Sequence, residues 1–365
     1  MATSRRALLA GALGLPLLAA CTDDGPRPPA TSSTQPGAGA QASSAVTVTG
    51  GDEALAAAVR EVYAGRSGVR ATATTGTWEG TAVAVATAGP DATLLVRAAG
   101  GWETVGGWWP SLKRPAPQLG TVPRFVLVIG SDARKGKPLA GSRADTLQVV
   151  GIDGAGGGGV VGIARDLWAS MPGGGKAKIN AAFSRGGGAA QAEAVERLSG
   201  LPISGYVVTG FGGFVAIVDE LGGIPVVLPK AIKGKGSGVD LPAGPQRLSG
   251  TQALAYARER KTMPDGDFGR SWHQGDLILA AGVAARLKGV GWTPTALAAV
   301  SEHSESDLGA AEALTFASAF YRLDPRKVGH AVAKGGFGRS ADGQSIVLLD
   351  AASRQVFERF RDGRL

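Results

Sequence analysis

Three apolar stretches between residues 125 and 164 constrain the fold of this chain more than any other feature. They read FVLVIG, TLQVVG and GVVGIA. Each has the length of a buried strand, and helical patterns alternate with strand patterns further along the chain. The sequence therefore predicts a three-layer α/β/α domain with a central mixed sheet, which we place at residues 122–365.

The remaining elements of this domain follow from the period of its apolar residues. Helices are expected at residues 188–199, 211–221, 249–260, 272–288, 308–323 and 351–361, and further strands at 224–228 and 345–350.

A smaller α+β domain is expected at residues 46–119. Its first segment, 51–65, has helical apolar spacing, and four strand-like runs follow it. Its tryptophans allow two interpretations, a sugar-stacking platform or buried packing. We favour packing, because small domains depend on buried aromatic side chains. The residues concerned are Trp102, Trp108 and Trp109.

The first residues predict an exported protein. Two arginines precede an apolar run, residues 7–20, that is too short to span a bilayer and is typical of a signal peptide. The run ends at Cys21, the single cysteine, in a context that resembles a bacterial lipobox. We therefore expect a signal peptide at 1–20, a lipid on Cys21 and a flexible tether at 21–45.

The basic charge of the chain agrees with a role at the cell envelope. The 365 residues carry a formal net charge of +8. Basic surfaces bind nucleic acid, anionic lipid or phosphorylated substrates. Since export separates the protein from nucleic acid, we expect partners at the outer face of the cytoplasmic membrane, namely the membrane itself, wall polymer or phosphorylated lipid.

Acidic residues and arginines recur where the predicted strands end. Asp132 follows the first strand, Asp145 precedes the second and Arg165 follows the third. Ligands of open α/β sheets bind at strand ends. Carboxylates are ligands of Mg²⁺ and arginine donates paired hydrogen bonds to phosphate, so these residues suit a pyrophosphate held with a divalent metal. Taken singly, each residue could also be a capping acid or part of a weak ion pair.

A second charged cluster, residues 256–274, reads YARERKTMPDGDFGRSWHQ. It is either a solvated face or part of a phosphate site. Arg258 and Arg260 are two positions apart and would point in different directions on a helix. Both can face one ligand only if the helix ends there. The alternative is that they complement the dipole at the helix C-terminus.

Several other chemistries are not indicated. The sequence contains no GxxxxGK[ST] phosphate loop and no GxSxG nucleophile motif. The three histidines, His273, His303 and His330, lack the spacing of zinc ligands. A lipid on the single cysteine excludes thiol catalysis.

Eight motifs in one order resemble the LytR-CpsA-Psr (LCP) family over about residues 122–363. They are VLVIGSDAR, SRADT, IARD, KINAAF, a Phe-x-x-Phe pair, IVDELGGIPV, LSGTQALAYARER and GDFGRSWHQ. The resemblance implies a three-layer fold with an apolar groove for a lipid tail. It implies an envelope phosphotransferase that uses Mg²⁺ or Mn²⁺ to move a glycopolymer from a polyprenyl-pyrophosphate carrier to peptidoglycan, through a phosphodiester.

The resemblance also assigns roles to single residues. Asp132 and Asp145 match metal-binding acids, and Asp267 is a further candidate for the acid that takes up a proton. The matching pyrophosphate-binding residues are Arg143, Arg165, Arg258, Arg260, Arg270 and Gln274.

Three points stay open at the level of sequence. The family usually has arginine where this chain has His273. If the imidazole lies at the phosphate, its pKa should be raised and the protein should bind the phosphate more strongly below neutral pH.

The apolar helical stripe Leu277, Ile278, Ala281 and Val283 is equally compatible with a lipid groove and with core. The alternative function is a non-catalytic lipoprotein that binds wall glycan or polyprenyl phosphates.

Overall fold

A six-stranded mixed sheet forms the centre of the structure. The structure is a computed structural model that describes residues 46–114, 116–134, 136–262 and 265–365. The strand order is β16-β11-β6-β7-β8-β17, in which β11 runs parallel to β6 and β17 parallel to β8, whereas β6, β7 and β8 are antiparallel. These strands are β6 (Arg124–Ser131), β7 (Ala144–Ile152), β8 (Gly158–Ile163), β11 (Ile203–Thr209), β16 (Glu305–Ser306) and β17 (Val328–Ala333).

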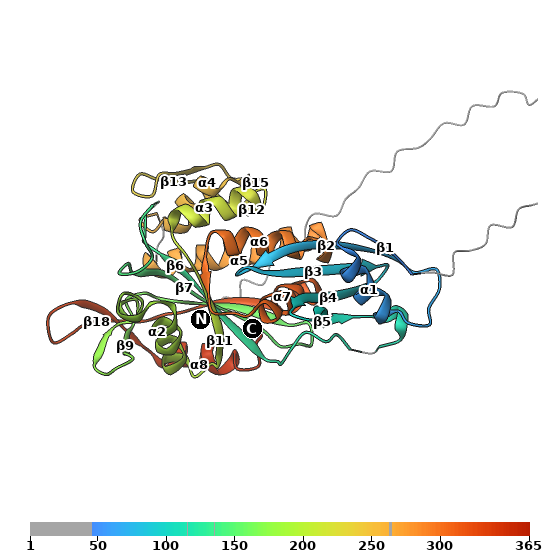
Figure 1. Cartoon of the computed structure of the whole chain (residues 1–365). Helices are drawn as coiled ribbons and strands as arrows, with labels where there is room; N and C mark the ends of the chain where they lie inside the picture. Colours follow the sequence, from blue (N-terminus) through green and yellow to red (C-terminus); the bar gives the residue numbers. More distant parts are fainter. Residues whose placement is uncertain (1–45, 115, 135, 263–264) are drawn as a thin grey trace, which may run out of the picture. The chain divides into compact units, whose positions relative to one another are not determined.

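Helices cover both faces of this sheet (Figure 1). Alternate residues of a strand point to opposite faces, and in β6 Phe125 and Leu127 pack with one set of helices whereas Val126 packs with the other. The first set is α2 (Ala181–Ser199) and α8 (Ala351–Arg359), and the second includes α5 (Asp267–Lys288), α6 (Thr293–Glu302) and α7 (Ala310–Ala319). The expected three layers are therefore present.

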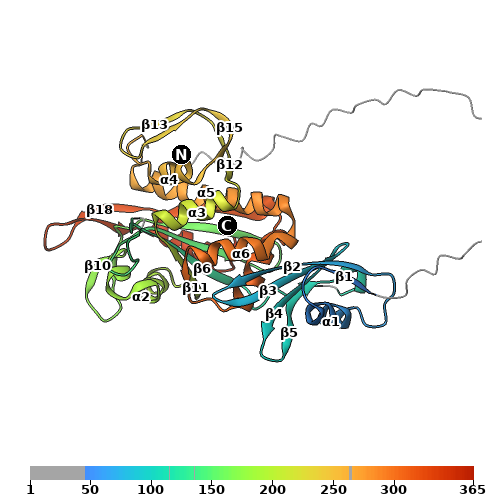
Figure 2. The same cartoon turned by 45° about the horizontal axis from the view of Figure 1, so that its top comes forward.

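A smaller unit lies against α5 (Figure 2). It contains α3 (Phe211–Glu220), α4 (Gly250–Arg258) and two antiparallel strand pairs, and its core includes Val218, Tyr256 and Leu277. The pairs are β12 (Ile224–Leu228) with β15 (Gly244–Leu248), and β13 (Ile232–Gly234) with β14 (Val239–Leu241). Two further short pairs are β9 (Trp168–Ser170) with β10 (Lys176–Lys178), and β18 (Gly335–Arg339) with β19 (Ser345–Leu349).

A separate five-stranded sheet precedes the central one in sequence. Its order is β1-β2-β3-β4-β5, and helix α1 (Glu53–Val62), capped by Asp52, packs on it. The strands are β1 (Thr47–Thr49), β2 (Arg70–Trp78), β3 (Thr81–Ala88), β4 (Asp91–Ala98) and β5 (Gly101–Trp108). Trp108 and Trp109 are buried, as the packing interpretation predicts, whereas Trp102 is only partly buried and packs at the edge of this core. The predicted fold class, a mixed central sheet preceded by a small α+β part, is confirmed.

Several element boundaries differ from the sequence-based expectation. Helix α5 begins at Asp267 rather than Trp272, directly after Gly266, whose φ is +53°. Helix α2 begins at Ala181 and is interrupted by non-helical backbone at Gly186 and Gly187. Helix α6 is absent from the sequence-based assignment, although a proline in its first turn is a recognised start signal.

Some predictions fall outside the described residues. The signal peptide, the lipid on Cys21 and the tether all lie within residues 1–45. Within the described residues, no helix combines the length and apolar character needed to cross a membrane.

Candidate functional site

Two strand ends and one helix start bring the central charged residues together. Asp145 lies at the start of β7 and Arg165 follows the end of β8. Arg165 Nη1 lies 2.7 Å from Asp145 Oδ1, and its Nε lies 3.6 Å from Asp267 Oδ2. These three predicted residues form one cluster.

Asp267, the first residue of α5, is shared by three arginines. Besides Arg165, its Oδ1 lies 3.5 Å from Arg260 Nη1 and 3.6 Å from Arg270 Nη2. An acid is favourable at a helix N-terminus, where the backbone N–H groups point outward. Asp267 thus lies near three arginine side chains, and their combined positive charge is larger than its single negative charge.

Burial and neighbouring carboxylates act in opposite directions on the pKa values of Arg270 and Arg165. Arg270 is only 8% exposed, and burial lowers its pKa, which nearby Asp267 partly offsets. For Arg165, burial acts to lower the pKa, but the hydrogen bond to Asp145 and the carboxylates around it leave the pKa raised. Arg165 Nε is buried and makes no hydrogen bond within the described residues. A donor of this kind suits an anionic ligand.

Asp132 lies on the loop after β6, and it contacts Arg143 only through hydrogen bonds to the Arg143 backbone. Asp132 Oδ1 accepts the Arg143 N–H at 2.9 Å, and the Asp132 N–H donates to the Arg143 carbonyl at 3.0 Å. The Arg143 side chain is exposed and does not line the cavity described below. Of the six predicted phosphate ligands, Arg143 is the one that the structure leaves apart.

Asp132 and Asp145 have the donor chemistry of a magnesium site. Both line the same cavity. The Oδ1 atom of each is engaged, by the Arg143 N–H and by Arg165, while neither Oδ2 atom makes a hydrogen bond within the described residues. Two carboxylates together with water and phosphate oxygens form a common Mg²⁺ shell. The residues present therefore fit the predicted metal.

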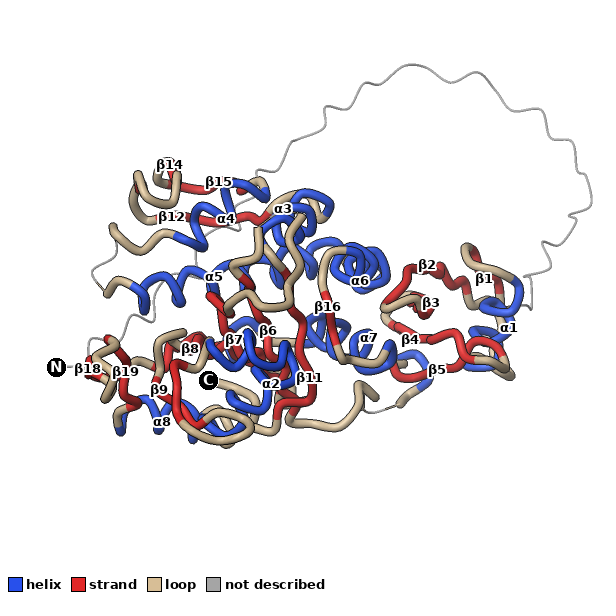
Figure 3. Tube along the Cα trace, turned by 60° about the vertical axis from the view of Figure 1, so that its left-hand side comes forward, coloured by secondary structure: helices blue, strands red, loops and turns tan. Residues whose placement is uncertain are grey.

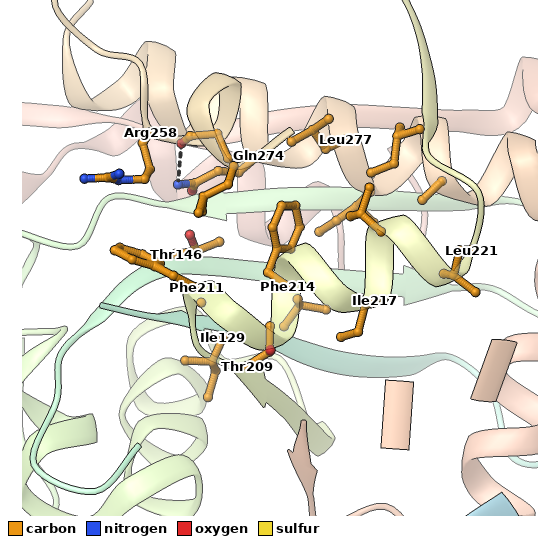
Figure 4. Close-up of a pocket in the computed structure, with 18 of the residues that line it drawn as sticks. Ile129, Thr146, Thr209, Phe211, Phe214, Ile217, Leu221, Arg258, Gln274 and Leu277 are labelled. Carbon is orange, nitrogen blue, oxygen red and sulfur yellow. Dashed lines mark hydrogen bonds between the residues drawn. The ribbon is translucent and has the colours of Figure 1, made fainter. Parts of the chain in front are cut away.

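Arg258 and Arg260 both reach the cavity because α4 ends between them. Arg258 is the last helical residue, and the next residue, Glu259, has extended backbone with φ −71° and ψ 128°. The Arg258 guanidinium lies 4.8 Å from the centre of the Phe211 ring. Gln274 Nε2 donates to the carbonyl of Ala257 at 3.1 Å, as Figure 4 shows. Lys261 and Arg134, which were not predicted as ligands, also line the cavity.

The cavity joins this charged cluster to a long apolar interior. Its volume is about 840 Å³. Figure 4 shows Arg258 and Gln274 near one end and Ile217 and Leu221 toward the other. Lining residues on α5 extend from Arg270 to Ala285, about 22 Å along the helix axis at about 1.5 Å per residue. Such a cavity suits a ligand with an anionic head and a long apolar tail.

The apolar stripe on α5 could line a lipid groove or belong to the core, and its residues differ in this respect. Leu277, Ile278 and Ala281 line the cavity, and Leu277 also belongs to a buried core cluster. Val283 does not line the cavity and is 48% exposed. Three of the four residues are thus placed where a lipid tail would contact them.

His273 lies beside the cluster rather than in the cavity. It is buried, stacks on Tyr256 with ring centres 4.1 Å apart, and is not among the residues that line the cavity. Burial lowers its pKa, and Asp276 offsets only part of this. Its Nδ1 has no hydrogen-bond partner within the described residues. The structure therefore does not place the imidazole where a phosphate would raise its pKa.

A second set of possible metal ligands lies elsewhere. Glu220, Glu302 and His303 offer three ligand atoms within 4.8 Å of one another, so this cluster could bind a metal ion. His303 Nε2 lies 2.6 Å from Glu220 Oε1. Glu302 and His303 are adjacent in sequence and Glu220 lies 82 positions before Glu302, and neither Asp132 nor Asp145 belongs to this cluster.

Comparison with curated proteins finds relatives over part of the chain. It is 37% identical to the regulatory protein MsrR of Staphylococcus aureus (strain COL) over 156 residues, 42% of this chain and 46% of that protein. It is 39% identical over 126 residues, 32% of each chain, to the polyisoprenyl-teichoic acid–peptidoglycan teichoic acid transferase TagV of Bacillus subtilis (strain 168). The matched region spans less than half the length of these relatives.

Solved structures share the fold. The crystal structure of B. subtilis TagV is 28% identical with a TM-score of 0.56, covering 66% of this chain and 97% of TagV. The structure of TagT bound to LIIa-WTA is 23% identical with a TM-score of 0.54, covering 67% of this chain and 92% of TagT.

The family model agrees with these likenesses. The model of the LytR_cpsA_psr family matches residues 115–359. This range contains the central sheet and every residue of the charged cluster, and it begins after the five-stranded sheet. The chain belongs to the LytR-CpsA-Psr family.

Proposed function

We propose that this protein transfers a glycopolymer from a polyprenyl-pyrophosphate carrier to peptidoglycan. The observation that carries the proposal is the union, in one cavity, of an arginine and carboxylate cluster with an apolar interior of lipid-tail dimensions. Support also comes from the family and from TagV, whose name describes transfer of teichoic acid from a polyisoprenyl carrier to peptidoglycan.

The arginines would bind the pyrophosphate, and the apolar walls would bind the polyprenyl tail. Arg258, Arg260 and Arg270 line the cavity together with Arg165 and Gln274. Forked guanidinium donors match phosphate oxygens, and burial increases the strength of each contact. Each CH₂ of the tail that leaves water contributes about 0.8 kcal/mol.

In the proposed reaction, a hydroxyl of peptidoglycan attacks the phosphorus atom next to the sugar. A new P–O bond forms, the bond to the distal phosphate breaks, and polyprenyl phosphate leaves with the electron pair. The hydroxyl proton passes to one of the carboxylates at the cluster, Asp132, Asp145 or Asp267. The arginines stabilise the negative charge that grows on the phosphate oxygens. A divalent metal, when bound by Asp132 and Asp145, supplies further charge neutralisation.

The proposed location is the outer face of the cytoplasmic membrane, with the lipid on Cys21 as anchor. A bound carrier would then have its tail near the membrane from which it came. Labelling with a radioactive fatty acid, lost in Cys21→Ser, tests the anchor.

A transfer assay tests the function. Purified protein, Mg²⁺, a polyprenyl-pyrophosphate glycan and peptidoglycan fragments should yield a covalent glycan–peptidoglycan product detected by mass spectrometry. The alternative, a lipoprotein that binds the carrier without turnover, predicts retention of the intact carrier and no product under any metal or pH.

A further inference from the structure

The five-stranded sheet contacts the segment between α5 and α6, and also the loop that precedes α7. Thr74 Oγ1 donates to the carbonyl of Gly291, and Trp78 Nε1 donates to the carbonyl of Leu308 at 2.8 Å. Thr74, Gly76 and Trp78 are alternate residues of β2, so they lie on one face of the strand. Figures 2 and 3 both show β2 and β3 beside α6.

At Gly76 the two parts meet backbone to backbone. A Cβ atom on Gly76 would lie 2.1 Å from the carbonyl oxygen of Pro294. This is far closer than any real contact, so any side chain here must push the sheet and the start of α6 apart. The φ of Gly76 is not positive, which means that close approach and not backbone conformation requires the glycine.

The same segment lines the cavity on its other side. Trp292, Thr293 and Ala296, from the end of the α5–α6 connection and the first turn of α6, are lining residues. So is Ala285, near the end of α5 opposite to Arg270. The wall that contacts the sheet is therefore the wall farthest along α5 from the phosphate cluster.

A shared core fixes the position of this wall. Trp78, Val83 and Leu94 of the sheet are buried with Leu297 of α6 and Leu314 of α7. Close-packed interiors have little free volume, so displacement on one side is transmitted to the other. The sheet thus acts as a rigid support behind the far wall.

We propose that the five-stranded sheet sets the length of prenyl tail that the cavity accepts. The inference rests on the proposed function, since it concerns the tail of the same carrier. The family model begins at residue 115, after this sheet, so the sheet is an addition to the part of the chain that the family defines. Under this proposal, the range of tail lengths that bind depends on the added sheet as well as on the family domain.

Binding of prenyl pyrophosphates of increasing length to the purified exported chain tests the proposal. The probes are geranyl, farnesyl, geranylgeranyl and undecaprenyl pyrophosphate in detergent. For the unchanged protein, affinity should rise with tail length until the cavity is filled, because each buried CH₂ raises the binding constant by roughly fourfold. In Gly76→Ala, the Cβ should drive the start of α6 toward the cavity, so the rise should stop at a shorter tail. We expect undecaprenyl pyrophosphate to bind about tenfold or more weakly, and geranyl pyrophosphate to within about twofold of the unchanged protein.

A matched control and a milder variant keep the result interpretable. Gly100→Ala lies in the turn between β4 and β5, and its Cβ would meet nothing within 4 Å, so it should bind all four probes like the unchanged protein. If Gly76→Ala fails to fold, Thr74→Val removes the hydrogen bond to Gly291 with little change in volume, and Thr75→Val, at an exposed position on the opposite face of β2, is its control.

The outcomes separate the two proposals. If the unchanged protein binds none of the probes, the proposed function fails. If it binds them, and the folded variant shows the same dependence on tail length as its control, the function survives and the role of the sheet is overturned.

Discussion

Arg165 Nη1 lies 2.7 Å from Asp145 Oδ1, although the two residues are 20 positions apart. The antiparallel pairing of β7 and β8 explains the contact, since the start of one strand meets the end of the other. Asp267 joins the pair from α5, more than a hundred residues later in sequence. The contact among Asp145, Arg165 and Asp267, which come from β7, the end of β8 and α5, lies at the centre of the site.

Asp145→Asn should abolish transfer while the protein stays folded. The substitution removes the charge partner of Arg165 and a predicted metal ligand. We expect kcat to fall by about a hundredfold or more, as for other groups that hold transition-state charge. The two side chains are 24% and 22% exposed, so the loss of stability should lie between about 1 kcal/mol, typical of exposed pairs, and about 3 kcal/mol, typical of buried ones. Product formation and urea unfolding measure the two effects. Asp240→Asn, which breaks an exposed pair with Lys233, is the control; equal activity of both variants would contradict the assignment.

Arg258→Ala should weaken binding of the carrier head. The guanidinium loses its forked contacts to phosphate and its position over Phe211. We expect about a tenfold to hundredfold loss of affinity for prenyl pyrophosphate, and a shallower salt dependence, measured by isothermal titration at two ionic strengths. Arg197→Ala removes an exposed cation on α2 and should have no effect. An unchanged affinity in Arg258→Ala would remove this residue from the site.

Ala281→Trp should block the apolar part of the cavity. Ala281 lines the cavity, whereas Val283 on the same helix is 48% exposed and does not. The larger side chain should therefore lower affinity for a long-tailed carrier by about tenfold or more, with inorganic pyrophosphate binding retained. Val283→Trp is the matched control and should bind like the unchanged protein. Should both variants bind the long tail normally, the tail does not occupy this cavity.

Removal of divalent metal should stop transfer, and binding of the metal that supports transfer should require Asp132 and Asp145. Binding of Mn²⁺, followed by electron paramagnetic resonance in the absence of carrier, should weaken in Asp132→Asn. His303→Asn, in the separate Glu220, Glu302 and His303 cluster, should leave activity unchanged even if it alters metal binding. Loss of activity in His303→Asn with normal activity in Asp132→Asn would reverse the assignment.

His273 should destabilise the fold at acid pH and leave carrier binding unaffected. Burial lowers its pKa in the folded protein, so the unfolded chain binds the proton more tightly. The free energy of unfolding should therefore decrease as pH falls below about 6.5, the ordinary value for histidine. His273→Phe keeps the stacking on Tyr256 and removes the titration, so urea unfolding should lose this component. Carrier binding should show the same pH dependence in both proteins; a change would place the imidazole at the phosphate after all.

Local patterns were sufficient for the layers of the fold. The short apolar run FVLVIG favours a buried strand, and Ser249 with Gln252 marks the start of α4 by a capping box that the structure shows. Boundaries were less accurate at Gly186 and Gly266, because glycine adopts conformations that sequence alone does not select.

The candidate residues were named from sequence, but their arrangement was not. Motif order selected Asp132, Asp145, Arg165 and Asp267, whereas only the fold shows that Arg143 is exposed, that His273 is buried, and that neither residue lines the cavity. Both residues lie within or beside the motifs that resemble the family, and a motif names residue types without showing which side chains line a cavity. The Glu220, Glu302 and His303 cluster had no sequence signal, because its members come from the ends of two helices.

The sequence by itself determined strands β6, β7 and β8, every α-helix except α6, and the chemistry available, because local propensity, apolar period and residue type are properties of short segments. The tertiary structure decided which of these groups meet. Arg165 reaches Asp145 through strand pairing and Asp267 through packing of α5 on the sheet. The cavity and the sheet behind its far wall exist only once α5, α6 and β2 are packed together, since a cavity is the space between elements rather than a property of any one of them.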